Sequence, residues 1–303
     1  MEVIKIKYNE VLKLDPCVMA IGFFDGFHIG HQKLIEETIK IASTKNIKKG
    51  IITFSNQANS IISKKSPKFL MSLDEKINYI NNYDFDYFVI LEFDEMFSKM
   101  EYNHFIDKYI IDSNIKEVVC GFDFRFGYKG KGNVSLLQNY SSAYTVSVIQ
   151  KQTIYNKRVS STLIRELITL GKLEDVKNML KRNYSISGIV IHGKKLGRKM
   201  GFPTANVDYT NHVIPKKGVY GGYAYYQGTK YVCMINVGYN PTVSNLNKPS
   251  LEVSIFDFDK DIYDEILNVE FVYYVREEQK FNGIDELKDQ LKRDRLSISN
   301  HIK

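Results

Sequence analysis

The sequence of 303 residues has no long apolar run. Its longest one, residues 17–24, is far shorter than the roughly 18 apolar residues of a membrane-spanning helix. The first residues include Glu2, Lys5 and Lys7, whereas a secretory signal peptide places its charge before a separate apolar stretch. These absences predict a soluble protein of the cytoplasm that has no membrane partner.

Cysteine is scarce, and its spacing is wide. Cys17, Cys120 and Cys233 are the only three, and no two of them form a CxxC pair. A disulfide framework needs an even set of cysteines, and a zinc cluster needs closely spaced ligands. We therefore expect neither, and a reducing compartment fits this composition.

Blocks of basic residues are also absent, although the chain is basic overall. Lys and Arg number 42 against 35 Asp and Glu, which gives a net charge of +7. This charge suits anionic partners such as nucleotides. A nucleic-acid-binding barrel would need cations interleaved with exposed aromatic side chains, and residues 218–237 have the aromatics but few cations. We therefore expect no nucleic acid partner.

Up to about residue 180, short apolar runs alternate with longer amphipathic segments. We predict helices over residues 32–42 and 73–83, and a third that follows the N-cap candidates at residues 160–162 and runs to residue 170. Strands are predicted over residues 17–21, 50–54, 87–91, 117–120 and 144–149. Ser72 and Glu75 have the spacing of a capping box, which starts the second of these helices. Strands that alternate with helices predict an α/β domain with a parallel sheet.

After residue 182, strand patterns follow one another with only turns between them. We predict strands over residues 184–191, 218–226, 231–237, 251–256 and 269–275. Residues 284–298 have the pattern of a closing amphipathic helix. The expected fold is a small antiparallel β-barrel with a terminal helix. Together the two patterns predict two domains, residues 1–183 and residues 184–303.

The most informative segment is residues 21–31, which read IGFFDGFHIGH. A strand ends there in a glycine-containing turn, and the N–H groups at the start of the next helix can face a phosphate. His28 and His31 are three residues apart and share a helix face, so both can donate hydrogen bonds to a phosphoryl group that gains charge. Two alternatives are a metal-binding pair and a pair of ordinary surface histidines.

This segment resembles the signature of the HxGH nucleotidyltransferases, and more narrowly that of the bacterial bifunctional riboflavin kinases/FMN adenylyltransferases. The resemblance continues in GFDFRFG at residues 121–127 and in VSSTLIR at residues 159–165. It covers nearly the whole chain in the family's order. It implies a Rossmann-like parallel sheet in the first domain, which adenylylates FMN to FAD with ATP and releases pyrophosphate.

The same resemblance implies roles for residues of the first domain. His28 and His31 would be catalytic and stabilise the transition state at the α-phosphate. Flavin contacts are implied for Asp123, Arg125 and Gly127, and ATP contacts for Phe24, Asp25, Gly26, Gly30, Ser161, Thr162 and Arg165. From the residues alone, residues 160–162 are equally well a helix cap, and Asp123 and Arg125 are equally well a structural ion pair.

The chain departs from the family after the second predicted strand. The family usually has Thr-Phe-x-Pro-His-Pro there, whereas this chain continues through Asn56, Gln57 and Ala58. Phe23 stands where Asn is frequent in the family, and Leu163 stands where Arg is frequent. The first departure lies at a strand end where we expect the substrate, so it bears on the efficiency of adenylyl transfer.

A second candidate site lies in residues 192–206, HGKKLGRKMGFPTAN. The segment is not a Walker A loop, because no Gly-Lys-Ser/Thr follows its last glycine. Its glycines and cations suit a loop over a polyphosphate, and a solvated surface loop is the alternative. Thr204 and Asn206 point to one face of an extended segment and carry oxygen ligands that Mg²⁺ accepts.

The string GFPTAN resembles the hallmark of riboflavin kinases, whose fold is a small Greek-key barrel. The resemblance implies that Thr204 and Asn206 hold magnesium and that Glu252 is the catalytic base for the ribityl 5′-hydroxyl. It implies flavin contacts at Arg276 and Phe281, and ATP contacts at Gly193, Gly197, Arg198, Gly201 and Pro203. Without the resemblance, Glu252 is equally well an exposed strand glutamate.

The expected protein is thus a bifunctional transferase. Its second domain would phosphorylate riboflavin to FMN, and its first would convert FMN to FAD, both with ATP and Mg²⁺. Riboflavin, FMN, FAD and ATP are the expected partners, and the sequence does not indicate an oligomeric state. The rival is a nucleotidyltransferase for a pantetheine phosphate or nicotinate mononucleotide, which has no use for a kinase-like second half.

Overall fold

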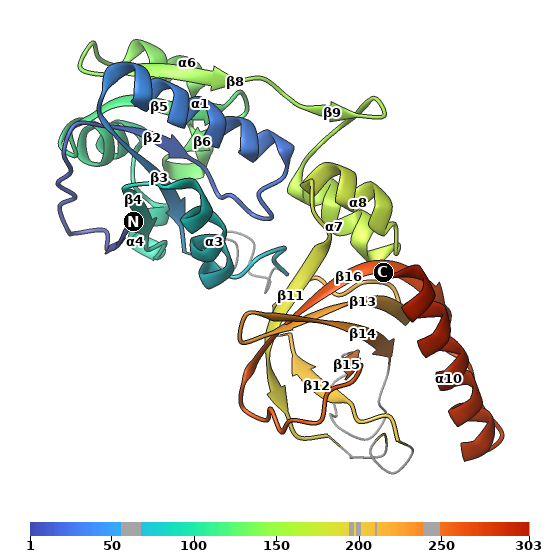
Figure 1. Cartoon of the computed structure of the whole chain (residues 1–303). Helices are drawn as coiled ribbons and strands as arrows, with labels where there is room; N and C mark the ends of the chain where they lie inside the picture. The colour runs from blue at the N-terminus through green and yellow to red at the C-terminus, as the bar shows by residue number, and fades with distance from the viewer. Residues whose placement is uncertain (56–67, 194–196, 198–200, 210, 239–248, 303) are drawn as a thin grey trace. The chain divides into compact units, whose positions relative to one another are not determined.

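The computed structural model describes residues 1–55, 68–193, 197, 201–209, 211–238 and 249–302. The chain divides into two compact units, Met1–Ser161 and Thr162–Lys303, each with its own hydrophobic core (Figure 1). No helix among the described residues is long and apolar enough to cross a membrane. The domain boundary predicted after residue 183 stays a prediction.

The first unit is built on a six-stranded parallel sheet. Its order is β1 (Glu2–Ile6), β4 (Tyr87–Leu91), β3 (Lys48–Phe54), β2 (Cys17–Ile21), β5 (Ile115–Gly121) and β8 (Thr145–Ile149). The predicted α/β class is confirmed, and β1 is a strand that the sequence pattern did not reveal. Because β3 lies on one side of β2 and β5 on the other, the strand order reverses there, and ligands of such sheets bind at this point beyond the carboxyl ends.

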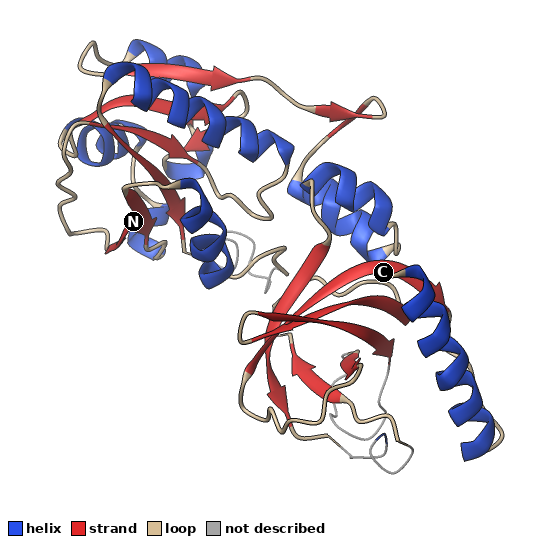
Figure 2. Cartoon of the chain, in the orientation of Figure 1, coloured by secondary structure: helices blue, strands red, loops and turns tan. Residues whose placement is uncertain are grey.

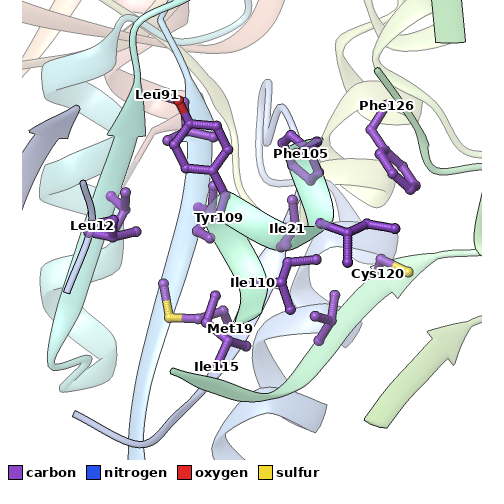
Figure 3. Close-up of a cluster of buried hydrophobic side chains, with 14 of the residues drawn as sticks. Leu12, Met19, Ile21, Leu91, Phe105, Tyr109, Ile110, Ile115, Cys120 and Phe126 are labelled. Atoms are coloured by element: carbon purple, nitrogen blue, oxygen red, sulfur yellow. The ribbon is translucent and has the colours of Figure 1, made fainter. Parts of the chain in front are cut away.

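Helices cover both faces of this sheet, because alternate residues of each strand point to opposite sides. Val18 and Ala20 of β2 meet α1 (Ile29–Lys45) and α3 (Leu73–Ile80). Met19 and Ile21 face the other way. There they join the core beneath α4 (Glu95–Ser98), α5 (Tyr102–Ile106), the π-helix η2 (Asp107–Ile111) and α6 (Val134–Asn139), part of which is drawn in Figure 3.

Short elements complete the unit. They are η1 (Asn81–Tyr83), β6 (Arg125–Phe126), η3 (Tyr128–Gly130), β7 (Gly132–Asn133), β9 (Thr153–Ile154) and β10 (Lys157–Arg158). The predicted capping box is confirmed: the Glu75 amide donates to Ser72 Oγ at 3.2 Å, and the Ser72 amide donates to Glu75 Oε2 at 2.6 Å. The capping box fixes the start of α3, the helix that carries Lys76.

The second unit is a closed antiparallel barrel with helices (Figure 2). Its strands follow the order β11 (Tyr184–Ile191), β12 (Ala205–Asp208), β15 (Ser250–Ile255), β14 (Thr229–Gly238), β13 (Gly218–Tyr226) and β16 (Ile266–Arg276). The terminal helix is α10 (Ile284–His301). The predicted barrel and closing helix are confirmed, and β12 is a strand that the sequence pattern did not reveal.

Two layers of apolar side chains hold this unit together. One consists of fully buried barrel residues such as Tyr220, Ile235, Val253 and Phe271. The other lies between the outer wall of the barrel and α10, and its buried members are Val219, Met234, Phe256, Ile298 and Ile302. Side chains alternate along β13 and β14, so one set fills the inside of the barrel and the other forms the surface on which α10 packs.

Two further helices, α7 (Ser161–Thr169) and α8 (Leu173–Leu180), precede the barrel. The helix α8 contacts β11 and β16 and buries Leu173, Val176, Met179 and Leu180. A fragment that begins at residue 184 therefore keeps every barrel strand but loses this apolar cover.

We predict that the fragment of residues 184–303 folds alone and melts at a lower temperature than the fragment of residues 162–303. Uncovering the apolar surface beneath α8 should cost more than 1 kcal/mol, which corresponds to a drop of at least about 4 °C for a domain of this size. Thermal unfolding followed by circular dichroism tests this. Equal melting temperatures would show that α8 adds nothing to the barrel.

Candidate active sites

The turn between β2 and α1 has an unusual backbone. Phe24 and Phe27 have positive φ angles of 51° and 42°, and Gly26 has a φ of 84°. Left-handed backbone at residues other than glycine costs on the order of 1–3 kcal/mol and persists only where the surroundings hold it. The rings of Phe24 and Phe27 are fully buried and stack with centroids 5.5 Å apart. Because these rings anchor the turn, only the backbone of Phe24 is left to meet a ligand.

A buried carboxylate joins this turn to the segment before α3. Asp25 is 1% exposed, and its Oδ1 accepts hydrogen bonds from the amides of Leu70 at 2.9 Å and Met71 at 3.1 Å. The hydroxyl of Ser161 donates to the carbonyl oxygen of Asp25 at 2.8 Å. Asp25 therefore shapes the turn, and Ser161 contacts its backbone.

The two histidines of the turn lie together as their spacing predicts. His28 is the N-cap of α1, and its Nδ1 accepts from the His31 amide at 3.4 Å. The two imidazole rings stack with centroids 3.8 Å apart. His31 Nδ1 is buried and has no hydrogen-bond partner among the described residues. Burial, followed by the nearby charges of His28 and Lys76, holds the pKa of His31 well below its usual range.

A buried lysine supports the same turn from α3. Lys76 is 0% exposed, and its Nζ donates to the carbonyl oxygen of Phe23 at 2.9 Å and lies 4.3 Å from the centroid of the Phe23 ring. Thr53 Oγ1 donates to the same carbonyl oxygen at 3.2 Å. The sequence analysis missed Lys76. It lies three residues after Leu73 and four before Ile80, so a lysine on the apolar face of a helix was the available signal.

The loop after β5 flanks the first turn at the same edge of the sheet. Ile21 at the end of β2 pairs with Cys120 near the end of β5, so the two loops leave the sheet side by side. Asp123 forms an ion pair with Arg158, whose guanidinium lies 4.7 Å from the centroid of the exposed Phe122 ring. The ion-pair partner of Asp123 is therefore Arg158, which the sequence analysis missed, and not Arg125, which the alternative named.

The remaining predicted residues of this half have varied places. Arg125 is exposed on β6, Gly127 has a φ of 70° against the backbone of Tyr102, and Gly30 lies beside the His28 ring. Thr162 and Arg165 belong to α7 in the second unit. The departure at residues 56–58 lies outside the described residues.

The second site begins with a row of polar side chains across three neighbouring strands. Glu252 of β15 pairs directly with Asn206 of β12 and with Asn236 of β14. Directly paired residues point to the same face of a sheet, whereas Leu251 and Val253 point to the opposite face and are buried. Asn236 was absent from the predicted set, and its register with Glu252 is visible only after the strands are paired.

The glycine-rich segment comes close to this row. A Cβ atom at Gly193 would lie 2.1 Å from Asn206 Nδ2, so only glycine fits at this position. The carbonyl oxygen of Gly197 accepts a hydrogen bond from the Phe202 amide at 2.9 Å, and Gly201 has a φ of 81°. Arg198 lies outside the described residues. Among the described parts of the segment, the backbone of Gly193 lies against the side-chain amide of Asn206, and that of Gly197 lies against Phe202 and Thr204.

Glu252 opens into a cavity of about 360 Å³ between the outer wall of the barrel and α10. Thr204, Asn236 and Glu252 supply polar groups to its wall. The apolar wall consists of Phe202, Val219, Met234, Phe281, Leu287 and Leu291. A cavity with a broad apolar wall and a few convergent polar groups suits a flat aromatic ligand that has polar edges.

A second cavity of about 380 Å³ adjoins the first. Pro203 and Thr204 line it together with the segment from Phe258 to Tyr263. Thr204 lines both cavities, whereas Ala205 and Val253 of the second point to the sheet face opposite Glu252.

Arg276 and Phe281, both predicted from the sequence, line the cavity of Glu252. Glu278 lines it as well and was not in the predicted set; its Oε1 lies so close to Gly238 that a Cβ there would approach to 2.0 Å. No group of three or more His, Cys, Asp or Glu side chains that could hold a metal occurs in the described part of the chain. The hydroxyl of Thr204 and the amide oxygen of Asn206 are donors that suit a magnesium ion, which a nucleotide and water would further coordinate.

Comparison with known families divides the chain in the same way. The model of the FAD synthetase family matches residues 11–163, and the model of the riboflavin kinase family matches residues 180–302. The histidine turn lies in the first match, and the row around Glu252 lies in the second.

Curated relatives match along nearly the whole chain. The bifunctional riboflavin kinase/FMN adenylyltransferase of Bacillus subtilis is 38% identical, over 92% of this chain and 90% of the relative. That of Listeria monocytogenes is 37% identical, over 91% and 90%. Among solved structures, one described as a macrolide-efflux protein from Streptococcus pneumoniae is 30% identical with a TM-score of 0.88, and the match covers 98% of this chain and 99% of that one.

We predict that replacing Lys76 with Met raises the pKa of His31. Removing the cation removes one of the causes that favour the neutral imidazole, and burial of the ring remains. An NMR titration of the His31 imidazole measures this directly. In the unfolded chain His31 takes up a proton below about pH 6.5, whereas in the folded chain it stays neutral to a lower pH. The free energy of unfolding of the wild type should therefore fall as the pH drops below about 6.5. That of the variant should fall less, because its folded-state pKa is higher.

The matched control is Lys33→Met. Lys33 lies two residues from His31 on α1, but it is exposed and paired with Glu36 at 2.6 Å. Its replacement should leave the His31 titration unchanged. A Lys76→Met variant whose His31 pKa is unchanged or lower would contradict the account of this site.

Proposed function

Because this chain belongs to the family of bifunctional riboflavin kinases/FMN adenylyltransferases, we propose that its barrel half phosphorylates riboflavin to FMN and that its α/β half adenylylates FMN to FAD. The observation that carries this proposal is the row of Asn206, Glu252 and Asn236 across three paired strands, of which Glu252 and Asn236 line one cavity. A nucleotidyltransferase for another acceptor has no use for a second phosphoryl-transfer site. The two sites support two successive reactions on one flavin.

In the kinase reaction, the 5′-hydroxyl oxygen of riboflavin attacks the γ-phosphorus of ATP, and the bond between this phosphorus and the β-bridging oxygen breaks. Glu252 accepts the hydroxyl proton, and ADP leaves. Thr204 and Asn206 would hold a magnesium ion, which would offset the charge of the phosphates. The backbone near Gly193 and Gly197 covers the phosphates, and the approach of Gly193 to Asn206 and of Gly197 to Thr204 supports this.

The two cavities separate the substrates of this reaction. The flavin ring occupies the cavity beneath α10, against Phe281, Leu287 and Leu291. The nucleotide occupies the adjoining cavity, with Pro203 and the segment from Phe258 to Tyr263 around it. Their reacting ends then meet beside Thr204, which lines both.

In the adenylyl transfer, a phosphate oxygen of FMN attacks the α-phosphorus of ATP, and pyrophosphate leaves with the electrons of the broken P–O bond. His28 and His31 donate hydrogen bonds to the oxygens that gain charge. The backbone of residues 24–26 and Gly30 approach the phosphates. Ser161, Thr162 and Arg165 bind the leaving pyrophosphate. Neither reaction needs a covalent enzyme intermediate, because each places an oxygen and a phosphorus in line.

The loop after β5 supplies the FMN site of this half. Asp123, Arg125 and Gly127 shape it, and the Arg158–Phe122 stack supports it by offering a flat cationic surface at the sheet's switch point. The enzyme works in the cytoplasm, where its three free, buried cysteines stay reduced. Its domains are residues 1–183 and 184–303.

We predict that Glu252→Gln abolishes FMN formation and leaves conversion of FMN to FAD at the wild-type rate. Loss of a general base typically costs about 10²–10⁴-fold in rate, and the second reaction uses another site. Chromatography of flavins after incubation with riboflavin, or with FMN, separates the two activities. The control is Glu265→Gln, an exposed glutamate of the same barrel. A Glu252→Gln variant that keeps more than about a tenth of kinase activity would remove Glu252 from this role.

We predict that His28→Ala and His31→Ala each slow FAD formation by about 10²–10³-fold, the typical cost of one lost donor to a transition-state oxyanion. The loss should fall on kcat more than on KM, because the interaction strengthens as charge develops. Pyrophosphate release with FMN and ATP measures it, and kinase activity in the same samples reports folding. His104→Ala, an exposed histidine of α5, is the control. Unchanged pyrophosphate release in both histidine variants would refute the assignment.

A further inference from the structure

The cavity beneath α10 contains an arginine that is held from behind by a buried carboxylate. Arg276 Nε donates to both oxygens of Asp294 at 3.0 Å, and Nη2 donates to Oδ2 at 2.7 Å. The side chain of Asp294 is 3% exposed and that of Arg276 is 15% exposed. Gln290 Nε2 donates to Asp294 Oδ1 at 2.8 Å. Both oxygens of the Asp294 carboxylate therefore accept hydrogen bonds, and they bind the Nε and Nη2 side of the guanidinium.

The two partners differ in their relation to the cavity. Arg276 lines it together with Glu252, whereas Asp294 lies on α10 and is not part of its wall. The guanidinium has five N–H bonds, and those to Asp294 and to the Glu277 carbonyl oxygen use three of them. The other two have no acceptor among the described residues, and they are the ones free to meet a ligand.

Helix docking alone does not account for this pair. Ile298 and Ile302 already anchor α10 on the barrel, and replacing a buried ion pair with apolar side chains of similar size is often neutral or stabilising. A second ion pair, Arg295–Asp257, joins the helix to the barrel at the surface. What the Asp294 carboxylate adds is a fixed orientation of one guanidinium at the cavity wall, because a bidentate pair restricts the planar fork of arginine.

We propose that Asp294 is a positioning residue for flavin binding in the kinase half: it holds the Arg276 guanidinium so that the two remaining N–H bonds point at the polar edge of the bound flavin. This inference rests on the proposed kinase function. It makes α10 part of the substrate site, although the helix contributes only apolar side chains to the cavity wall itself. It also gives the turn at 276–278 a defined shape, since Arg276 Nη1 bonds the Glu277 carbonyl oxygen at 3.0 Å.

The test is the steady-state kinetics of FMN formation by Asp294→Asn in the full chain. An amide keeps the shape of the side chain but loses the charge and one acceptor. We expect KM for riboflavin to rise at least about tenfold, with kcat and KM for ATP close to wild type, because a group that contacts the flavin away from the reacting atoms contributes uniform binding. Conversion of FMN to FAD in the same preparation should be unchanged.

Two further variants separate positioning from helix docking. Asp257→Asn removes the surface ion pair of α10 (Arg295 Nη2 to Asp257 Oδ1, 2.7 Å) and should leave KM for riboflavin unchanged. Arg276→Lys keeps a cation for Asp294 but loses the fork, and it should raise KM for riboflavin to a similar degree. The double variant should then be little worse than either single one, since both act through one interaction.

Several results would overturn the inference. One is an Asp294→Asn variant that folds and keeps the wild-type KM for riboflavin. Another is a variant in which KM for riboflavin and KM for ATP rise to the same degree and the melting temperature falls. That result would show that Asp294 only docks the helix. If Asp294→Asn does not fold, an unchanged KM in Arg276→Lys refutes the proposal. A wild type that makes no FMN in this assay would instead refute the kinase function, so the two failures are distinguishable.

Discussion

Alternation along β-strands is the constraint on which both halves of this protein depend. Along β2, Val18 and Ala20 enter one core while Met19 and Ile21 enter the other, so a single strand joins both layers of the sheet. Along β15, Leu251 and Val253 are buried and Glu252 is left facing outward. The same period of two therefore builds a core and places the proposed catalytic base, Glu252, next to it.

The two sites use this scaffold differently. At the edge of the sheet, the turn after β2 is held by buried groups from distant segments: Asp25 binds the amides ahead of α3, and Lys76 and Thr53 share the carbonyl oxygen of Phe23. In the barrel, the polar row lies on the outer wall, and α10 closes a cavity over it. The first site thus depends on a strained loop that its neighbours hold, and the second on strand register and a docked helix.

Local signals made much of the fold predictable. The bounds of β2, β4, β11 and β13 follow from apolar runs bounded by turn residues, and the Ser72–Glu75 box marks the start of α3. The exposed strand β1 was missed because most of its residues face solvent and it shows no apolar run. The strand β12 was missed because it is short and follows a glycine-rich segment whose polar residues suggested chemistry more than structure.

The sites were predictable where their residues are close in sequence. His28 and His31 stack because His28 is the N-cap of α1 and His31 lies in the first turn of that helix. Lys76 contacts Phe23 across 53 positions, and the Arg276–Asp294 pair forms only once α10 has docked, so neither follows from local spacing. Long-range pairings of this kind depend on tertiary packing, and a single sequence carries no direct record of them.

The central claim is that a phosphoryl-transfer site and an adenylyl-transfer site act in succession on one flavin. The most direct measurement is a time course of the wild-type chain with riboflavin, ATP and Mg²⁺, in which flavins are separated by chromatography and pyrophosphate is measured in parallel. The account predicts that FMN forms first and that FAD then rises together with an equal amount of pyrophosphate. Riboflavin that stays unconverted, or FMN that accumulates without FAD or pyrophosphate, would contradict it.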